Sequence, residues 1–479
     1  MINLKKIGKF LGILLAAYVL YVIAFAVFPY IHPKEVSEEF KSTTKGEDFF
    51  AETECTDRVA LVERPIRSLD ARLYLINCAE KTLDISYFAV SQGASTDAFF
   101  AEILHAADRG VQVRLLFDGM SGNFKDNKAM GSTLASHPNI QFVLYNTIHL
   151  LKPWTFNGRL HDKYILVDNK FLLLGGRNIG DHYFGLEDYT GSITIDRDVL
   201  VFNTGYEKAE NRDSVVYALR KYMDEIWNGE NVTPFPAGKA SETEKELARL
   251  RGISLEIHGT FNEEEIGLTD EQYSAMTFPA NKVSLITNDT HIYPKEPKVM
   301  YAIASILSQA KQDVLLQSPY IVPDRNIMRI LEQMGQTKAS YRILTNSLAS
   351  SPNIPAFSAY TAHRDEIIQT GADIYEFQSR HSIHSKTYLA DDRMSIVGSC
   401  NLDPRSLYID TELMLVIDSR GFTQQLRQVI GEYEKRSLIV GEDGDYLENA
   451  DLEPFPVAKW KEILIKAVSI PASWLKFLV

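Results

Sequence analysis

Cysteine is scarce in this chain, with three among 479 residues. This scarcity excludes a small fold held together by many disulfides, and no cluster of Cys and His has the spacing of metal ligands. Cys55 and Cys78 flank a predicted helix and could pair outside the cytoplasm. The alternative is that both, like Cys400, are free thiols.

An excess of positive charge is also absent. The chain has 50 Lys and Arg against 63 Asp and Glu, a formal net charge of −13. Capture of nucleic acid through a broad basic surface depends on neutralising phosphates, so we expect no nucleic-acid partner. Hydrophobic residues make up 45% of the chain, as in globular proteins, and the length suits two domains or two similar lobes.

One stretch near the N-terminus contains no charged residue. Residues 10–31 form an apolar run about long enough to cross a bilayer as a helix. Three lysines, ending at Lys9, precede it and three glutamates, beginning at Glu35, follow it, so we expect a cytoplasmic N-terminus. A cleavable signal peptide is the alternative, but its small-x-small site, 24–26, lies inside the run. We therefore predict an uncleaved membrane anchor over 1–34.

In the rest of the chain, one α/β sequence pattern occurs twice. Alternating helices and apolar strands predict a first lobe over 47–227 and a second over 283–445. In the first lobe, 163–176 predicts a hairpin around Asp168, and 386–399 has the same pattern in the second. The predicted fold class is α/β, with two similar lobes of mixed sheets flanked by helices and related by a pseudo-twofold axis.

Two segments lie outside the lobes. Residues 228–282 are polar and irregular, which predicts a linker with one short surface helix over 243–250. The tail, 446–479, has Trp460, Trp474 and Phe477 among lysines. This composition suits a segment in the headgroup layer of a membrane, and a helix docked on the protein core is the alternative.

A polar motif is repeated at identical spacing in the two lobes. A histidine, a lysine two places on and an aspartate five further are followed by a strand, small residues and an asparagine. The first copy is His161, Lys163, Asp168, Gly175, Gly176 and Asn178, and the second is His384, Lys386, Asp391, Gly398, Ser399 and Asn401.

This motif suits attack on a phosphodiester. Residues i and i+2 of a strand face the same way, so His161 and Lys163 project together. A neutral imidazole supplies the nucleophile, while lysine neutralises charge on the phosphate oxygens. A second, protonated imidazole, His384, can give a proton to the leaving oxygen if the two copies meet. Lysine beside each histidine would repel a cation, so we expect no metal and no other cofactor.

Each histidine also needs a partner on its other ring nitrogen. Asp196 and Asp198 follow the first motif, and Asp410 and Glu412 follow the second. Aligning the apolar strands that come next places Asp198 opposite Glu412. We therefore predict Asp198 and Glu412 as the residues that orient the histidines.

These motifs resemble the phospholipase D superfamily, whose double-lobed members carry HxK, four residues and Asp twice. The stretches 175–185, 343–351 and 398–406 are similar to bacterial cardiolipin synthases. The resemblance implies a phosphohistidine on His161, with His384 as acid and then base. It also implies phosphate contacts from Lys163, Lys386, Asn178, Ser399 and Asn401, whereas Asp168 and Asp391 brace the lobes.

The same resemblance implies a reaction and a location. Such enzymes move a phosphatidyl group from one phospholipid to a glycerol hydroxyl of phosphatidylglycerol, which predicts membrane phospholipids as partners. The catalytic part would lie outside the cytoplasm, on a single-pass protein of the bacterial cell membrane. A phospholipase D-type hydrolase, acting on phospholipids or less readily on nucleic acid, is the alternative. Two departures stand out: Gly176 faces Ser399 in the alignment, and Asp410 replaces the asparagine common in relatives.

Overall fold

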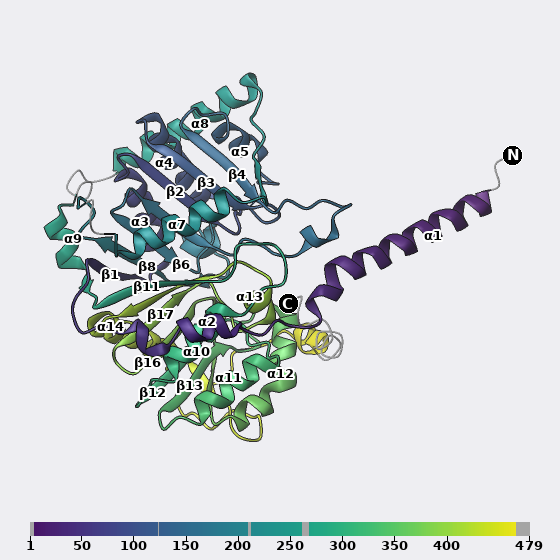
Figure 1. Cartoon of the computed structure of the whole chain (residues 1–479), viewed down its shortest axis with the longest axis vertical. Coiled ribbons are helices and arrows are strands. Elements are labelled where there is room, and N and C mark those ends of the chain that lie inside the picture. The colour runs from purple at the N-terminus through teal and green to yellow at the C-terminus, as the bar shows by residue number, and fades with distance from the viewer. Residues whose placement is uncertain (1–3, 123, 209–211, 261–267, 466–479) are drawn as a thin grey trace.

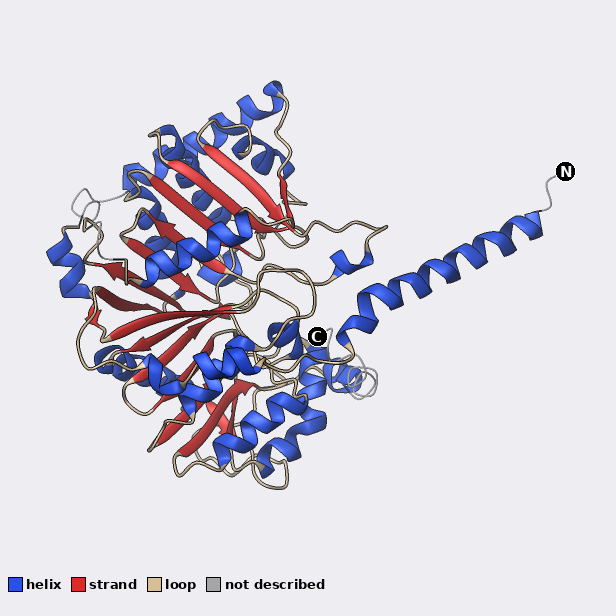
Figure 2. Ribbon diagram, viewed as in Figure 1, coloured by secondary structure: helices blue, strands red, loops and turns tan. Residues whose placement is uncertain are grey.

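Two stacked lobes form the body of the protein. The computed structural model describes residues 4–122, 124–208, 212–260 and 268–465. Each lobe is built on one large sheet with helices packed against it, and helix α1 (Leu4–Val22) projects away from the body (Figures 1 and 2). The predicted α/β architecture of two similar lobes is confirmed.

The first lobe has a sheet of nine strands in the order β10-β1-β8-β6-β5-β2-β3-β4-β9. The strands are β1 (Asp57–Val62), β2 (Thr82–Tyr87), β3 (Gln112–Asp118), β4 (Ile140–Tyr145), β5 (Lys163–Val167), β6 (Phe171–Gly175), β8 (Asp198–Asn203), β9 (Val232–Pro234) and β10 (Phe278–Pro279).

The second lobe has a sheet of eight strands in the order β11-β18-β17-β16-β12-β13-β14-β19. They are β11 (Lys282–Thr287), β12 (Asp313–Gln317), β13 (Ser340–Asn346), β14 (Asp373–Phe377), β16 (Lys386–Ala390), β17 (Met394–Gly398), β18 (Leu413–Asp418) and β19 (Ser437–Ile439). Apart from β10, the two sheets have the same order and the same pattern of parallel and antiparallel pairs. The repeated sequence pattern therefore reflects a repeated fold.

Helices cover the faces of both sheets. They are α3 (Pro65–Asn77), α4 (Ala94–Asp108), α5 (Lys128–Leu134), α6 (Asp181–Phe184), α7 (Val215–Trp227), α8 (Ala240–Thr260), α9 (Asp270–Met276), α10 (Lys298–Leu307), α11 (Arg325–Gly335), α12 (Ile354–Gln369), α13 (Pro404–Tyr408) and α14 (Arg420–Glu434), with α2 (Glu38–Thr43) after the N-terminal apolar helix. Several begin at a polar side chain that accepts a backbone N–H, such as Ser214, Asp324 and Asn353.

The lobes meet through an apolar interface. Each lobe has its own core on the outer side of its sheet. A third buried cluster takes residues from both sheets and from α7 and α14, including Leu166, Val199, Leu315 and Val397. Because central strands such as β6 are buried along their whole length, they appear in the sequence as continuous apolar runs.

The N-terminal segment contains one helix, Lys5–Tyr30, that is long and apolar enough to cross a membrane. After α1 the chain continues as a π-helical turn, Ile23–Val27, and a 3-10 turn, Phe28–Tyr30. Only 6% of the most apolar 18-residue stretch of this helix is buried against the protein. An apolar helix this exposed fits insertion in lipid better than a place in the core.

The segment between the lobes is more ordered than the sequence suggested. Instead of one short helix, 228–282 contains β9, α8, α9 and β10, and both strands join the first sheet. Helix α8 runs over 21 residues and packs on α4 and α5 through the fully buried Leu250.

Two other expectations have different outcomes. Cys55 and Cys78 are free thiols, exposed and partly buried respectively, so of the two alternatives the unpaired one holds. In the tail, residues 459–465 are helical, and Lys461 donates to the carbonyls of Leu348 and Ser351 at 3.1 and 3.0 Å. Trp474 and Phe477 lie outside the described residues.

Candidate active site

Short backbone contacts between the lobes position the two histidines. Strand β15 (Ser382–Ile383) pairs in parallel with β7 (Thr194–Ile195), directly before His384. Leu160 makes the equivalent parallel bridge to Thr411, directly before His161. Each histidine therefore enters the lobe interface beside a carboxylate of the opposite lobe.

Both predicted histidines have such a partner. Nδ1 of His161 lies 2.9 Å from a carboxylate oxygen of Glu412, and Nδ1 of His384 lies 2.6 Å from one of Asp196. Both carboxylates are fully buried, and the imidazoles are 12% and 13% exposed. Because each carboxylate occupies Nδ1, Nε2 of each ring is the nitrogen left for chemistry.

The structure corrects the prediction for Asp198. Its carboxylate contacts Arg72 at 3.0 Å, Arg177 at 2.7 Å and Ser68 at 2.6 Å, and it is a buried structural ion pair. Asp196 contacts His384 instead. The strand registers explain the error, because Asp198 pairs with Gly175 whereas Met414 pairs with Gly398. Thus Asp198 corresponds to Met414, and Asp196 to Glu412.

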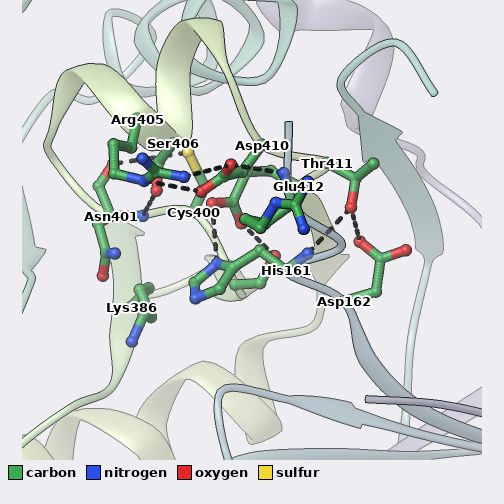
Figure 3. Close-up of polar contacts among 12 residues, drawn as sticks. His161, Asp162, Lys386, Cys400, Asn401, Arg405, Ser406, Asp410, Thr411 and Glu412 are labelled. Atoms are coloured by element: carbon green, nitrogen blue, oxygen red, sulfur yellow. Dashed lines mark hydrogen bonds and ion pairs between the residues drawn. The ribbon is translucent and has the colours of Figure 1, made fainter. Parts of the chain in front are cut away.

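The two motif lysines lie in the same buried space. Lys163 donates to the carbonyl of His161, and Nζ of Lys386 lies 3.0 Å from Nδ1 of His384 and 3.2 Å from its Nε2. Each ammonium also acts on the histidine of the other lobe, since Lys386 lowers the pKa of His161 and Lys163 that of His384. In Figure 3, His161 lies among Lys386, Asn401 and Glu412 of the second lobe. The site thus concentrates positive charge suited to an anion.

Burial and neighbouring charges shift the pKa values of both histidines, both lysines and Glu412. Burial lowers the pKa of His384 to about 4 and that of His161 well below its usual range. Burial also lowers the pKa of Lys163 to about 7 and of Lys386 to about 8, and raises that of Glu412 to about 7.

Asp196 behaves differently from Glu412. Burial raises the pKa of Asp196, but the hydrogen bond with His384 and the charge of Lys386 outweigh it and leave the pKa below its usual range. Asp196 therefore remains ionised, and an ionised partner stabilises a protonated imidazole better than a neutral one. The two halves of the site are electrostatically unequal.

The three polar side chains predicted to contact the phosphate, Asn178, Asn401 and Ser399, have different surroundings. Asn178 accepts from the backbone N–H of Ala89 at 3.2 Å and donates to Tyr183 at 3.0 Å. The equivalent Asn401 has a buried side-chain oxygen with no hydrogen-bond partner among the described residues. The hydroxyl of Ser399 donates to Glu412, so it supports a carboxylate.

The equivalent positions 176 and 399 hold glycine and serine, and this difference has a steric cause. A Cβ at Gly176 would lie 2.4 Å from a carboxylate oxygen of Asp196. The Asp196 side chain thus occupies the space that serine would need. In the second lobe, the longer Glu412 leaves room for Ser399.

The motif aspartates lie away from the histidines, at the hairpin turns. Asp168 has a φ of 51° and accepts from the backbone N–H groups of Glu80, Lys81 and Thr82 at 2.8–3.1 Å. Asp391 repeats this with a φ of 53° and the N–H groups of residues 311–313. Their contacts join each hairpin to the neighbouring strand and do not reach the histidines.

Sequence reasoning missed a polar network behind His161. The backbone N–H of His161 donates to Thr411, whose hydroxyl donates to Asp162 at 2.8 Å. Asp410 pairs with Arg405 at 3.0 Å and accepts from the N–H of Arg159 at 2.9 Å (Figure 3). No spacing in the sequence links these segments, which lie about 250 positions apart. Within the part of the chain that the structure describes, no cluster of three His, Cys, Asp or Glu side chains could hold a metal ion.

Two lobes that bring duplicated HxK motifs to one interface define the phospholipase D superfamily. The family model for the cardiolipin synthase, PLD-like domain matches residues 73–208 and 303–433, more than half of the chain. The chain belongs to this family and is an enzyme of the phospholipase D superfamily.

Similar proteins agree with this placement. The chain is 27% identical to cardiolipin synthase C of Escherichia coli over 467 residues, 86% of this chain and 95% of that protein. It is also 27% identical to an uncharacterized protein of Helicobacter pylori over 413 residues, 79% of each chain. The crystal structure of phosphatidylserine synthase from Haemophilus influenzae superposes with a TM-score of 0.63 over 92% of this chain and 99% of that one, at 14% identity, which supports the fold.

Proposed function

We propose that this protein is a phosphatidyltransferase that makes cardiolipin from phosphatidylglycerol and a second phospholipid through a phosphohistidine. The crossed pairs, His161 with Glu412 and His384 with Asp196, carry the proposal. They place two oriented imidazoles and two lysines in one buried site. The similarity to cardiolipin synthase C supports lipid substrates of this kind.

In the first half-reaction, Nε2 of His161 attacks the phosphorus of the donor lipid. An N–P bond forms while the bond from phosphorus to the headgroup oxygen breaks, and protonated His384 gives its proton to that oxygen. Lys163 and Lys386 neutralise the phosphate oxygens, which crowd together in the transition state.

In the second half-reaction, neutral His384 takes the proton of a glycerol hydroxyl of phosphatidylglycerol. The hydroxyl oxygen attacks phosphorus, the N–P bond breaks, and His161 is regenerated. Burial lowers the pKa of His384, but the ionised Asp196 counteracts this effect, and the negative charge of a bound phosphodiester favours the protonated imidazole further. This supports His384 as the acid and His161 as the nucleophile.

The site residues Lys163, Lys386, Asn178 and Asn401 bind the phosphate in this proposal, and Ser399 acts through Glu412. The apolar helix Lys5–Tyr30 anchors the enzyme in the bacterial cell membrane as a single span, with the catalytic lobes outside the cytoplasm. This arrangement keeps the site next to its lipid substrates.

Product analysis tests the proposal. The purified full-length protein is incubated with vesicles of phosphatidylglycerol, with and without a second phospholipid, and the lipids are separated by mass. We expect cardiolipin together with the free headgroup of the donor lipid, which is glycerol when phosphatidylglycerol is the donor, and neither product from His161→Ala. Phosphatidic acid as the only lipid product would show a hydrolase and contradict the transfer reaction.

A further inference from the structure

A loop next to the anchor helix exposes apolar side chains. The loop 147–156 connects β4 to the segment that carries His161, and its tip includes Ile148, Leu150 and Leu151. Their exposed fractions are 43%, 68% and 71%. Three large apolar side chains exposed together on one loop are typical of a surface that contacts lipid or protein.

The loop is tied to the side of the anchor helix. The hydroxyl of Tyr18 donates to the carbonyl of Leu150 at 2.9 Å, and that of Tyr21 to the carbonyl of Leu151 at 3.1 Å. The helix becomes buried against the protein at Ala26, which is 5% exposed. At a rise of 1.5 Å per residue, the two tyrosines lie about 12 and 8 Å along the helix before this point. Half of a hydrocarbon core is about 15 Å thick. If the helix crosses the membrane, the loop tip therefore lies at the depth of the acyl chains.

Much of the backbone of the loop tip is hydrogen-bonded, which lowers the cost of its burial in lipid. Unpaired N–H and C=O groups are costly in hydrocarbon, where water cannot bind them. The N–H of His149 donates to the hydroxyl of Thr155 at 3.0 Å, that of Leu151 to the ring of His149 at 3.2 Å, and that of Lys152 to the carbonyl of His149 at 2.8 Å. The carbonyls of Leu150 and Leu151 accept from the anchor tyrosines. The long side chain of Lys152 can place its charge at the headgroups.

The base of the loop is fixed to the active-site segment. Arg159, two residues before His161, donates to the carbonyls of Asn146 at 2.9 Å and Thr155 at 2.6 Å. The side chain of Asn157 donates to the carbonyl of Ala26 in the anchor at 2.6 Å. The anchor, the loop and the strand that follows His161 are thus held as one unit.

We propose that the loop 147–156 is inserted in the acyl-chain layer of the outer leaflet and holds the active site against the lipid surface. This inference rests on the membrane anchor in the proposed function. Its partner is the bilayer, which Leu150 and Leu151 contact through apolar side chains. The loop, with the anchor, thereby fixes the height of His161 above the lipid headgroups.

A depth measurement tests the insertion without depending on turnover. Leu150→Cys is made in full-length protein carrying Cys55→Ser and Cys78→Ser, labelled with an environment-sensitive fluorophore, and reconstituted in vesicles of phosphatidylglycerol and phosphatidylcholine with spin-labelled acyl chains. Leu255→Cys on α8, where the native side chain is 75% exposed, is the matched control. We expect several-fold stronger quenching at 150 than at 255. Equal, weak quenching at both positions would overturn the inference.

A second pair of variants tests what the insertion does. Leu150→Glu with Leu151→Glu should lower turnover of lipid in vesicles about tenfold, through weaker insertion of the loop. Turnover of lipid dispersed in detergent should stay within about twofold, because the site itself is intact. Leu255→Glu should affect neither assay, and equal turnover of the loop variant and Leu255→Glu on vesicles would contradict this role. A wild-type protein that inserts the loop but makes no cardiolipin would refute the proposed function alone.

Discussion

Asp196 of the first lobe lies 2.6 Å from Nδ1 of His384 in the second lobe. The reciprocal pair joins Glu412 of the second lobe to His161 of the first at 2.9 Å. Because each pair takes its histidine from one lobe and its carboxylate from the other, neither lobe alone contains a complete pair. In the proposed mechanism, the apolar lobe interface therefore assembles the active site as well as holding the lobes together.

The first prediction separates Asp196 from Asp198. Asp196→Asn keeps the shape of the side chain but removes the charge that favours protonated His384, so kcat should fall roughly 100- to 10,000-fold. The melting temperature should change little. Steady-state kinetics and calorimetry on the same preparations measure both.

Asp198→Asn is the matched control. Its carboxylate neutralises the buried Arg72 and Arg177, so this substitution should lower the free energy of unfolding by roughly 3–5 kcal/mol. The fraction that remains folded should retain most of its kcat. A catalytic defect for Asp198→Asn as large as that of Asp196→Asn, at equal stability, would restore Asp198 as an orienting residue.

The second prediction concerns the hairpin aspartates. Asp168→Ala removes the acceptor of three backbone N–H groups and places alanine at a φ of 51°. We expect a loss of about 2–4 kcal/mol of unfolding free energy, with kcat of the folded enzyme nearly unchanged. Asp168→Asn should lose less, because asparagine tolerates left-handed backbone and keeps one acceptor. Chemical denaturation compares them, and full stability with lost activity would contradict the structural role.

The third prediction concerns pH. A lysine is charged below its pKa and neutral above it, and the pKa is about 7 for Lys163 and about 8 for Lys386. Glu412, with a pKa of about 7, gains negative charge over the same range. Affinity for a phosphodiester should therefore be nearly constant below about pH 6 and fall as pH rises through 7 and 8, by up to roughly tenfold per pH unit for each lysine.

Glycerophosphoglycerol is a suitable probe, because its phosphodiester keeps one negative charge across this range. Calorimetric titration of the full-length enzyme from pH 6 to 9 measures the profile. Lys386→Met should bind more weakly and lose the part of the decline centred near pH 8. Affinity that rises with pH would show that the lysines do not bind the phosphate as ammonium groups.

Local sequence patterns predict the helices, strands and motifs well, but they do not predict which carboxylate contacts His384. The hairpin of β5 and β6 followed from alternating apolar runs around Asp168, and both HxK motifs were recognised from spacing alone. Asp196 and Asp198 could not be separated, because a slip of two residues along a strand keeps the same face inward. The choice depends on the cross-strand register, which places Asp198 beside Gly175.

Helix α8 was underestimated for a different reason. The sequence predicts a helix only over 243–250, yet α8 continues through Gly252 to Thr260. A Cβ at Gly252 would meet no atom within 4 Å, so no packing or turn geometry requires glycine at this position. The burial of Leu250 against the first lobe, together with the packing of α8 on α4, stabilises the helix despite the low intrinsic helix propensity of glycine. Tertiary contacts of this kind leave no local mark in the sequence.

Trapping the covalent intermediate tests the central claim most directly. With a phosphatidyl ester of p-nitrophenol, whose leaving group needs no proton, His384→Ala should form the phosphoenzyme and accumulate it, because the acceptor hydroxyl then lacks the base that takes its proton. Peptide mapping should place the phosphatidyl group on His161, and His161→Ala should form none. A phosphatidyl group found on His384, or none on either histidine during turnover, would contradict the account.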